Sequence, residues 1–290
     1  MILSMTGYGK ATFESEGKKF TAEIKSLNSK QLDLSIRIPQ QFRELELTLR
    51  SIIAQKLERG KIDLTITVET ISSDTTTTIN IAAARTYKQQ IEAMAESLSI
   101  PLPEDWFATL LRLPDVMKTE VEDANESETD ALTKAVQAAI NQLIDFRTQE
   151  GNRLERFFQE KIDNIQALLL DVPKYEEERV IKIKKRIQDA LEKLGDIDYD
   201  KNRFEQEMIF YIEKLDITEE KIRLQNHLEY FVHTMTTGSG QGKKLGFISQ
   251  EMGREINTLG SKANQAELQK VVVRMKDQLE QIKEQVLNVM

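Results

Sequence analysis

The spacing of the apolar residues changes along this chain, and that change constrains the fold more than any other feature. Over residues 32–38 and 61–70, apolar and polar residues alternate, which is typical of strands with one buried face. From about residue 128 onward, apolar residues recur at intervals of three and four, which is typical of amphipathic helices. The sequence therefore predicts an α+β fold, with strands first and long helices afterwards.

The N-terminal region is predicted to be an antiparallel β-sheet covered by at least one helix. The expected strands cover residues 2–13, 19–27, 32–38 and 61–70, and the expected helix covers residues 42–57. Gly7 and Gly9 interrupt the first strand pattern, which indicates either a local irregularity or the close approach of another backbone.

Between the sheet and the long helices, the sequence predicts two more helices and a connection. The helices are expected over residues 81–98 and around Trp106, after a turn at residues 72–78. Residues 115–130 are acidic and polar, so we expect an exposed connection there and a domain boundary near residue 125.

A long helical hairpin is predicted next. Residues 128–170 and 173–194 both have helical periodicity, and Pro173 is expected to start the second helix, since proline fits the first turn of a helix better than its interior. The second helix carries a basic group that fits either a phosphate contact or an ordinary solvated face. That group consists of Lys182, Lys184, Lys185 and Arg186.

These patterns divide the chain into three parts. We expect an N-terminal α+β domain over residues 1–125, a helical arm over 126–212 and a C-terminal helical domain over 213–290. With no cysteine, the 290 residues can form no disulfide, cysteine zinc site or thiol nucleophile. No apolar run approaches the ~20 residues that cross a bilayer, and the start of the chain does not resemble a signal peptide, which fits a cytoplasmic protein without membrane contact.

The net charge of −8 argues weakly against a nucleic-acid partner. A local basic face can nevertheless bind phosphate while the rest of the surface is acidic.

The helical pattern that follows Asp216 has a polar face suited to phosphodiester chemistry. Asp216, Glu220, Arg223, His227 and Tyr230 recur at intervals of three and four, so their side chains are neighbours. Arginine can hold a phosphate through two hydrogen bonds, and histidine can transfer a proton near neutral pH. The same spacing also fits an exposed helix with a salt bridge and an unused histidine.

A glycine-rich segment, residues 236–244, follows this helix. It lacks the spacing of a Walker phosphate-binding loop and comes after a helix rather than a strand, so we predict a hinge. Lys243 and Lys244 could still contact phosphate at the start of the next helix.

Glu251 and Glu255 lie four residues apart in that next helix, and their carboxylates repel each other unless a cation lies between them. A divalent metal is one such cation, and a basic side chain such as Arg254 is another. The last helix has a heptad seam that needs a partner, either within the chain or from another subunit. The seam consists of Leu268, Val272, Met275, Leu279, Ile282 and Val286.

Blocks at both ends of the chain resemble the YicC-like (YloC-like) bacterial endoribonucleases. They are SMTGYGKA, SLNSKQLDLSIRIP and LERGKIDLTI near the start, and DITEEKIRLQNHL, GKKLGFISQEMGREINTLGSKA and VVVRMKDQLEQIKEQVLNV near the end. The resemblance covers the whole chain. It implies an endoribonuclease that needs divalent metal, manganese in preference to magnesium, and a ring-like homohexamer that opens and closes over RNA.

Three positions depart from the family pattern. Ser29 stands where the family usually has a histidine, Gly246 where it has an aspartate, and Gly253 where it has an asparagine. Roles that depend on those side chains do not carry over to this chain.

Taken together, the sequence predicts a metal-dependent endoribonuclease, with a non-catalytic RNA-binding or assembly scaffold as the alternative. Glu220, Glu251 and Glu255 are the predicted metal ligands. The other predicted catalytic residues are Arg223 and Arg254, which hold phosphate charge, and His227, which transfers a proton or positions a ligand. A second route dispenses with catalytic metal and uses His227 as the acid or base, with attack by the ribose 2′-hydroxyl.

RNA is predicted to lie against basic side chains gathered on one inner surface. These side chains are Arg37, Arg43, Lys61, Lys182, Lys185, Arg186, Lys243, Lys244 and Lys262.

Overall fold

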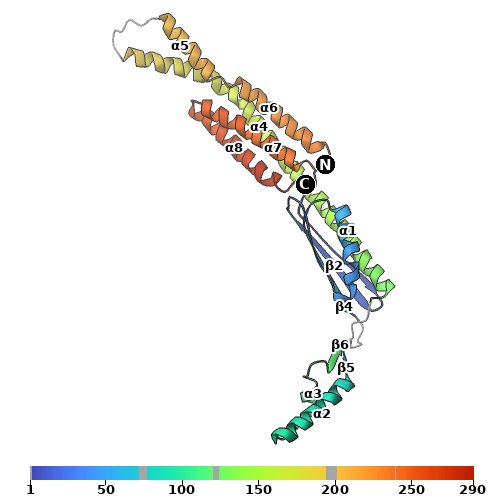
Figure 1. Ribbon diagram of the computed structural model, residues 1–290. Helices are drawn as coiled ribbons and strands as arrows, with labels where there is room; N and C mark the ends of the chain where they lie inside the picture. Colours follow the sequence, from blue (N-terminus) through green and yellow to red (C-terminus); the bar gives the residue numbers. More distant parts are fainter. Residues whose placement is uncertain (1, 72–76, 120–123, 194–200, 239) are drawn as a thin grey trace.

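The computed structural model describes residues 2–71, 77–119, 124–193, 201–238 and 240–290. The molecule is elongated, with a small lobe at one end, a sheet body in the middle and a helical body at the other end (Figure 1). Both ends of the chain lie where the sheet body meets the helical body. Within the described ranges, no helix is both long and apolar enough to cross a membrane.

The sheet body contains four strands in the order β1-β2-β4-β3. The strands are β1 (Gly7–Ser15), β2 (Lys18–Leu27), β3 (Leu32–Arg37) and β4 (Gly60–Thr70). The pairs β1–β2 and β2–β4 are antiparallel as predicted, but β3 pairs with β4 in parallel, so the sheet is mixed. Between β3 and β4 the chain passes through η1 (Gln40–Leu45) and α1 (Glu46–Lys56), and such a crossover lets the next strand run in the same direction.

One face of this sheet is buried against α1 and the start of α4 (Glu126–Glu192). Gly9 shows how closely β1 and α4 approach, because a Cβ atom at this position would lie 2.0 Å from the backbone oxygen of Ala139. Of the two interpretations of the glycines in the first strand, the close approach of another backbone is therefore the correct one at Gly9. Residues 2–6, predicted to begin the first strand, lie outside β1 and contact the end of the chain instead, where Met5 N donates to Asn288 O.

A single helix, α4, runs through both the sheet body and the helical body (Figure 1). It begins where the side chain of Asn125 accepts a hydrogen bond from the backbone N–H of Glu128. The predicted break at Pro173 is wrong, since α4 continues through this proline. A proline inside a helix removes one backbone hydrogen bond. Leu169 and Val172 are buried in the helical core just before it, and this packing outweighs the local cost.

The helical body packs the second part of α4 against α6, α7 and α8. After α4 come α5 (Lys201–Lys214), α6 (Thr218–Thr236), α7 (Gly242–Lys262) and α8 (Ala266–Val286). The predicted heptad seam of α8 is buried, and its partners are α4 and α7 of the same chain. The α+β class and the C-terminal helical region are therefore confirmed.

The small lobe contains the two predicted helices, α2 (Ile81–Leu98) and α3 (Trp106–Leu110). It also contains a strand pair that the sequence did not predict, β5 (Thr77–Ile79) with β6 (Met117–Thr119). The expected exposed connection from residue 115 thus includes a strand, and Val116 just before that strand is buried. The expected turn at 72–78 lies largely outside the described residues.

Candidate active site

Two of the predicted polar faces meet along the contact between α6 and α7, which we call the seam. At one end of the seam, Lys262 Nζ lies 2.7 Å from Glu220 Oε1 and donates to the backbone oxygen of Asp216 at 2.8 Å. At the other end, Lys244 Nζ lies 4.8 Å from the centre of the Tyr230 ring. These contacts fix which sides of the two helices face each other.

Helical geometry places the remaining predicted residues between these two contacts. On α7, Glu251, Glu255 and Lys262 follow Lys244 by 7, 11 and 18 residues, which are close to whole numbers of 3.6-residue turns. All four side chains therefore lie along one side of α7. On α6, Glu220 and His227 are seven residues apart and share one side in the same way. Together the two helices bring carboxylates, a histidine and lysines to one seam.

Glu255 is the most unusual of these side chains. It is only 9% exposed, yet its carboxylate makes no hydrogen bond or ion pair with any described residue. Glu251, one turn before it, pairs with Arg254, whose Nη1 lies 2.8 Å from Glu251 Oε1 and whose side chain is largely exposed. A carboxylate in a largely buried side chain is costly unless a positive group compensates it. Among the described residues, no positive side chain pairs with Glu255.

Glu220 has a different environment from the one predicted for a metal ligand. It is 7% exposed and already has the Lys262 ammonium as its counter-charge. In the part of the chain that the structure describes, no three His, Asp or Glu side chains are placed to hold one metal ion. The predicted cluster of three carboxylates is thus not formed within one chain. Glu251 and Glu255 remain as a pair, and a pair fits a divalent ion whose other ligands come from water and substrate phosphate.

His227 and Arg223 lie on α6, seven and three residues after Glu220. His227 is half-buried and has no hydrogen-bond partner among the described residues. Arg223 is exposed and pairs with Glu219 on the next turn of α6. Because exposed pairs at this spacing stabilise a helix only weakly, the guanidinium can exchange this partner for phosphate.

Tyr230 belongs to the predicted polar face of this helix but was not among the predicted catalytic residues. Its ring carries the contact with Lys244, so it holds one of the predicted phosphate ligands at the seam. At the opposite end, hydrogen bonds from the Thr218 side chain and backbone lower the pKa of Asp216, which keeps this carboxylate ionised at the start of α6.

Comparison with known proteins identifies the family. The family described as "Endoribonuclease YicC-like, N-terminal region" matches residues 2–156, and "Endoribonuclease YicC-like, C-terminal" matches residues 171–290. The chain belongs to the YicC-like family. A protein of Clostridioides difficile named "Probable endoribonuclease YicC" is 29% identical over 295 residues, covering all of both chains. A protein of the same name from Haemophilus influenzae is 32% identical over 299 residues, covering 99% of both.

Two of the departures from the YicC-like pattern lie away from the seam. A Cβ atom at Gly246 would lie 3.6 Å from Val286, and one at Gly253 would lie 3.3 Å from Lys283 Nζ. Both neighbours belong to α8. The glycines therefore change the contact between α7 and α8 and remove no ligand from the side of α7 that faces α6.

The predicted RNA contacts are distributed over both bodies of the molecule. Those in the sheet body and on the far part of α4 are all exposed. They are Arg37 on β3, Arg43 in η1, Lys61 on β4, and Lys182, Lys185 and Arg186 on α4. Lys243 and Lys244 lie in the first turn of α7, while the ammonium of Lys262 binds Glu220 and Asp216 inside the seam. The predicted contacts thus belong to elements of both bodies of the molecule.

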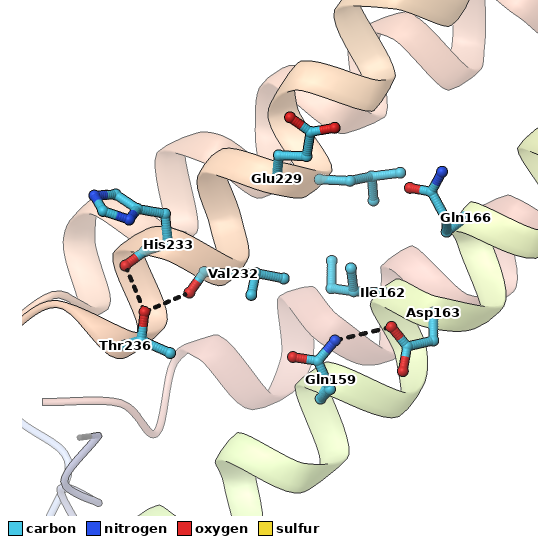
Figure 2. Close-up of a pocket in the computed structure, with 9 residues that line it drawn as sticks. Gln159, Ile162, Asp163, Gln166, Glu229, Val232, His233 and Thr236 are labelled. Atoms are coloured by element: carbon cyan, nitrogen blue, oxygen red, sulfur yellow. Dashed lines mark hydrogen bonds between the residues drawn. The ribbon is translucent and has the colours of Figure 1, made fainter.

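A hollow of about 450 Å³ lies on another side of α6, against α4 (Figure 2). Its charged and titratable lining residues are Asp163, Glu229 and His233, and none of the predicted site residues lines it. Asp163 accepts a hydrogen bond from Gln159, and the His233 ring turns away from both (Figure 2). The hollow does not assemble an acid with a base, so the seam remains the better candidate for an active site.

Proposed function

We propose that this protein is a divalent-metal-dependent endoribonuclease whose active site is the seam between α6 and α7. The chain belongs to a family of endoribonucleases, and both relatives above carry the name probable endoribonuclease. The observation that carries the site assignment is Glu255, whose side chain is only 9% exposed and whose carboxylate has no hydrogen-bond or ion-pair partner among the described residues, one helical turn from Glu251. Such a pair needs a positive ligand, and no side chain in the described ranges forms an ion pair with Glu255.

The pair of Glu251 and Glu255 would hold the metal, manganese in preference to magnesium. When bound, the ion supplies a Lewis acid that polarises the scissile phosphate or lowers the pKa of a water molecule. Arg223 and Arg254 hold the phosphate charge through paired N–H groups. His227 holds or accepts a proton at its imidazole.

The site assignment is tested by RNA cleavage with manganese, with magnesium and with excess chelator. We expect Glu255→Ala and Glu251→Ala each to lower the rate by about a hundredfold or more, as for removal of a group that acts on the transition state. Glu267→Ala is the matched control, since this exposed carboxylate pairs with Lys270 on α8, away from the seam. If Glu251→Ala and Glu255→Ala both cleave at the wild-type rate, the assignment fails.

The ends of the products separate the two chemical routes. A 5′-phosphate on the downstream product fits water activated by metal. A 2′,3′-cyclic phosphate fits attack by the ribose 2′-hydroxyl with His227 as acid or base. Cleavage that persists in excess chelator would contradict the proposed dependence on metal. A protein that binds RNA but leaves it uncut with either metal is instead the non-catalytic scaffold.

We also infer that the chain forms a ring-like homo-oligomer, a homohexamer, that encloses RNA. Large apolar side chains are exposed at both ends of the elongated molecule (Figure 1), among them Phe107 in the lobe and Phe210 on α5. Two different surfaces at opposite ends favour head-to-tail contact, and such contacts close into a ring when the rotation between copies allows it. Closing a ring would also bring the scattered basic residues of several copies around one opening. Analytical ultracentrifugation of the sample used for cleavage measures the particle mass. A monomer at micromolar concentration would contradict the ring.

A further inference from the structure

Arg147 is a buried guanidinium where the sheet body meets the helical body. It lies on α4 and is 3% exposed. Its Nη2 donates to Ser26 Oγ at 2.5 Å, to the backbone oxygen of Arg59 at 3.1 Å and to that of Met5 at 3.4 Å. Its Nε has no partner, and its Nη1 meets the sulfur of Met290 at 3.9 Å, which is a weak acceptor. The N–H groups on Nε and Nη1 of this guanidinium therefore donate to no oxygen atom.

The charge of Arg147 also lacks a counter-charge. All of its oxygen acceptors are neutral, and it makes no ion pair with any carboxylate in the described ranges. Burial lowers the pKa of Arg147, which expresses the cost of keeping the charge away from water. Buried charges in proteins are normally paired, so an anion beside Arg147 would remove an existing penalty.

A pocket of about 320 Å³ lies beside this guanidinium. Besides Arg147, its charged lining residues are Lys56, Arg59 and Glu58, so positive charge predominates. Arg59 uses Nε to bind the backbone oxygen of Ser29. The apolar part of the lining includes Leu57 and Ile144. A pocket lined by both positive and apolar side chains suits a ligand that has an anionic head and an apolar body.

We propose that this pocket binds a nucleotide, with the phosphate against Arg147, Arg59 and Lys56 and the base against the apolar wall. The nucleotide is either a free mononucleotide or the terminal nucleotide of an RNA chain. Because Leu3, Arg147 and Gly240 all line the pocket, a bound nucleotide contacts the N-terminal segment, α4 and the glycine joint before α7 together. It would therefore connect the two bodies of the molecule.

Binding is tested by calorimetric titration of the full chain with adenosine monophosphate, with adenosine and with inorganic phosphate. We expect saturable binding of the monophosphate, weaker binding of phosphate and none of adenosine. Lys56→Glu reverses an exposed charge at the pocket and should weaken binding about tenfold or more. Lys134→Glu is the matched control, because this exposed lysine pairs with exposed Asp130 elsewhere on α4, and it should bind as the wild type does.

Arg147→Gln should abolish binding, provided that circular dichroism shows the variant to be folded. If Arg147→Gln does not fold, the Lys56→Glu variant decides the test. Short 2′-O-methyl RNA with a 5′-phosphate or a 5′-hydroxyl separates the two sources. Tighter binding of the phosphorylated end than of the free mononucleotide identifies an RNA terminus, and the reverse identifies a free nucleotide. The proposal is overturned if neither adenosine monophosphate nor the 5′-phosphorylated RNA saturates the wild type. It is also overturned if Lys56→Glu, or a folded Arg147→Gln, binds as tightly as the wild type does. This experiment measures binding and not cleavage, and the pocket shares no residue with the seam. The nucleotide proposal and the active-site proposal can therefore fail independently of each other.

Discussion

The two parts of α4 build two different cores from one continuous helix. The first part lies against the sheet with small residues, among them Ala135 and Ala139, where β1 comes so close that Gly9 has no room for a side chain. The second part lies among α6, α7 and α8 with large residues, among them Phe158 and Ile165. Small side chains on α4 let β1 approach its backbone at this point, whereas the large side chains of the second part fill the space between packed helices. The two parts of α4 thus meet their partners in different ways.

The helical core should be sensitive to the loss of a large side chain. The ring of Phe158 is fully buried and packs edge-on against Phe157 and Phe231, with ring centres 5.8 and 5.7 Å apart. We expect Phe158→Ala to lower the free energy of unfolding by about 3–5 kcal/mol, through lost burial and the cavity left behind. Urea denaturation followed by circular dichroism measures this, and a loss below about 1 kcal/mol would show that this core can collapse around the gap.

The sheet core should be sensitive in the opposite sense, to the gain of a single methyl group. Gly9→Ala places a Cβ atom 2.0 Å from Ala139 O and 2.9 Å from Leu143 N, and both are backbone atoms that cannot turn aside. We expect a loss of about 1–3 kcal/mol, as for other overpacked sites, measured by the same denaturation. The matched control is Gly246→Ala, where the new methyl meets only Val286 at 3.6 Å and should stabilise α7 by about 0.5–1 kcal/mol.

These two substitutions also test whether the two cores are separate units. If Phe158→Ala and Gly9→Ala shift different transitions, each part of α4 unfolds with its own body. A single transition that moves equally in both variants would contradict the division and show that α4 couples the cores into one cooperative unit.

The smallest effect is expected at the start of α6. Because hydrogen bonds from Thr218 lower the pKa of Asp216 from its ordinary value of 3.8, this carboxylate stabilises the folded chain above that pH. The contribution is lost as the pH falls through the lowered pKa. Asp216→Ala should therefore reduce the melting temperature at pH 7, with a smaller difference from the wild type near pH 2.

Asn80→Ala is the control for this pH dependence. The Asn80 side chain accepts a hydrogen bond from Ala83 N at the start of α2 and does not titrate. Its effect should be the same at both pH values. A pH-independent loss at Asp216 as well would mean that the hydrogen bonds act without the charge.

Much of the fold follows from short-range pattern, and the outcome at particular elements shows why. The heptad seam of α8, the helix α2 and the strands β2 and β4 were predicted because each depends on which neighbours a side chain has within its own helix or strand. The break at Pro173 was predicted by the same local logic and is wrong, because packing of Leu169 and Val172 outweighs the local cost of proline. The parallel pairing of β3 with β4 depends on where the chain goes between them, which periodicity does not record.

The candidate site divides in the same way. Spacing alone placed Glu251 and Glu255 on one side of their helix, and Glu220, Arg223 and His227 on neighbouring positions of theirs. Only the tertiary structure decided that the two sides face each other, that Lys262 neutralises Glu220 across 42 residues of sequence, and that Glu255 is left without a partner. It also showed that Arg147, four residues after Leu143 on an otherwise apolar stripe, lies beside a pocket. Local geometry is set by neighbours in the sequence, whereas burial and charge pairing are set by long-range contacts.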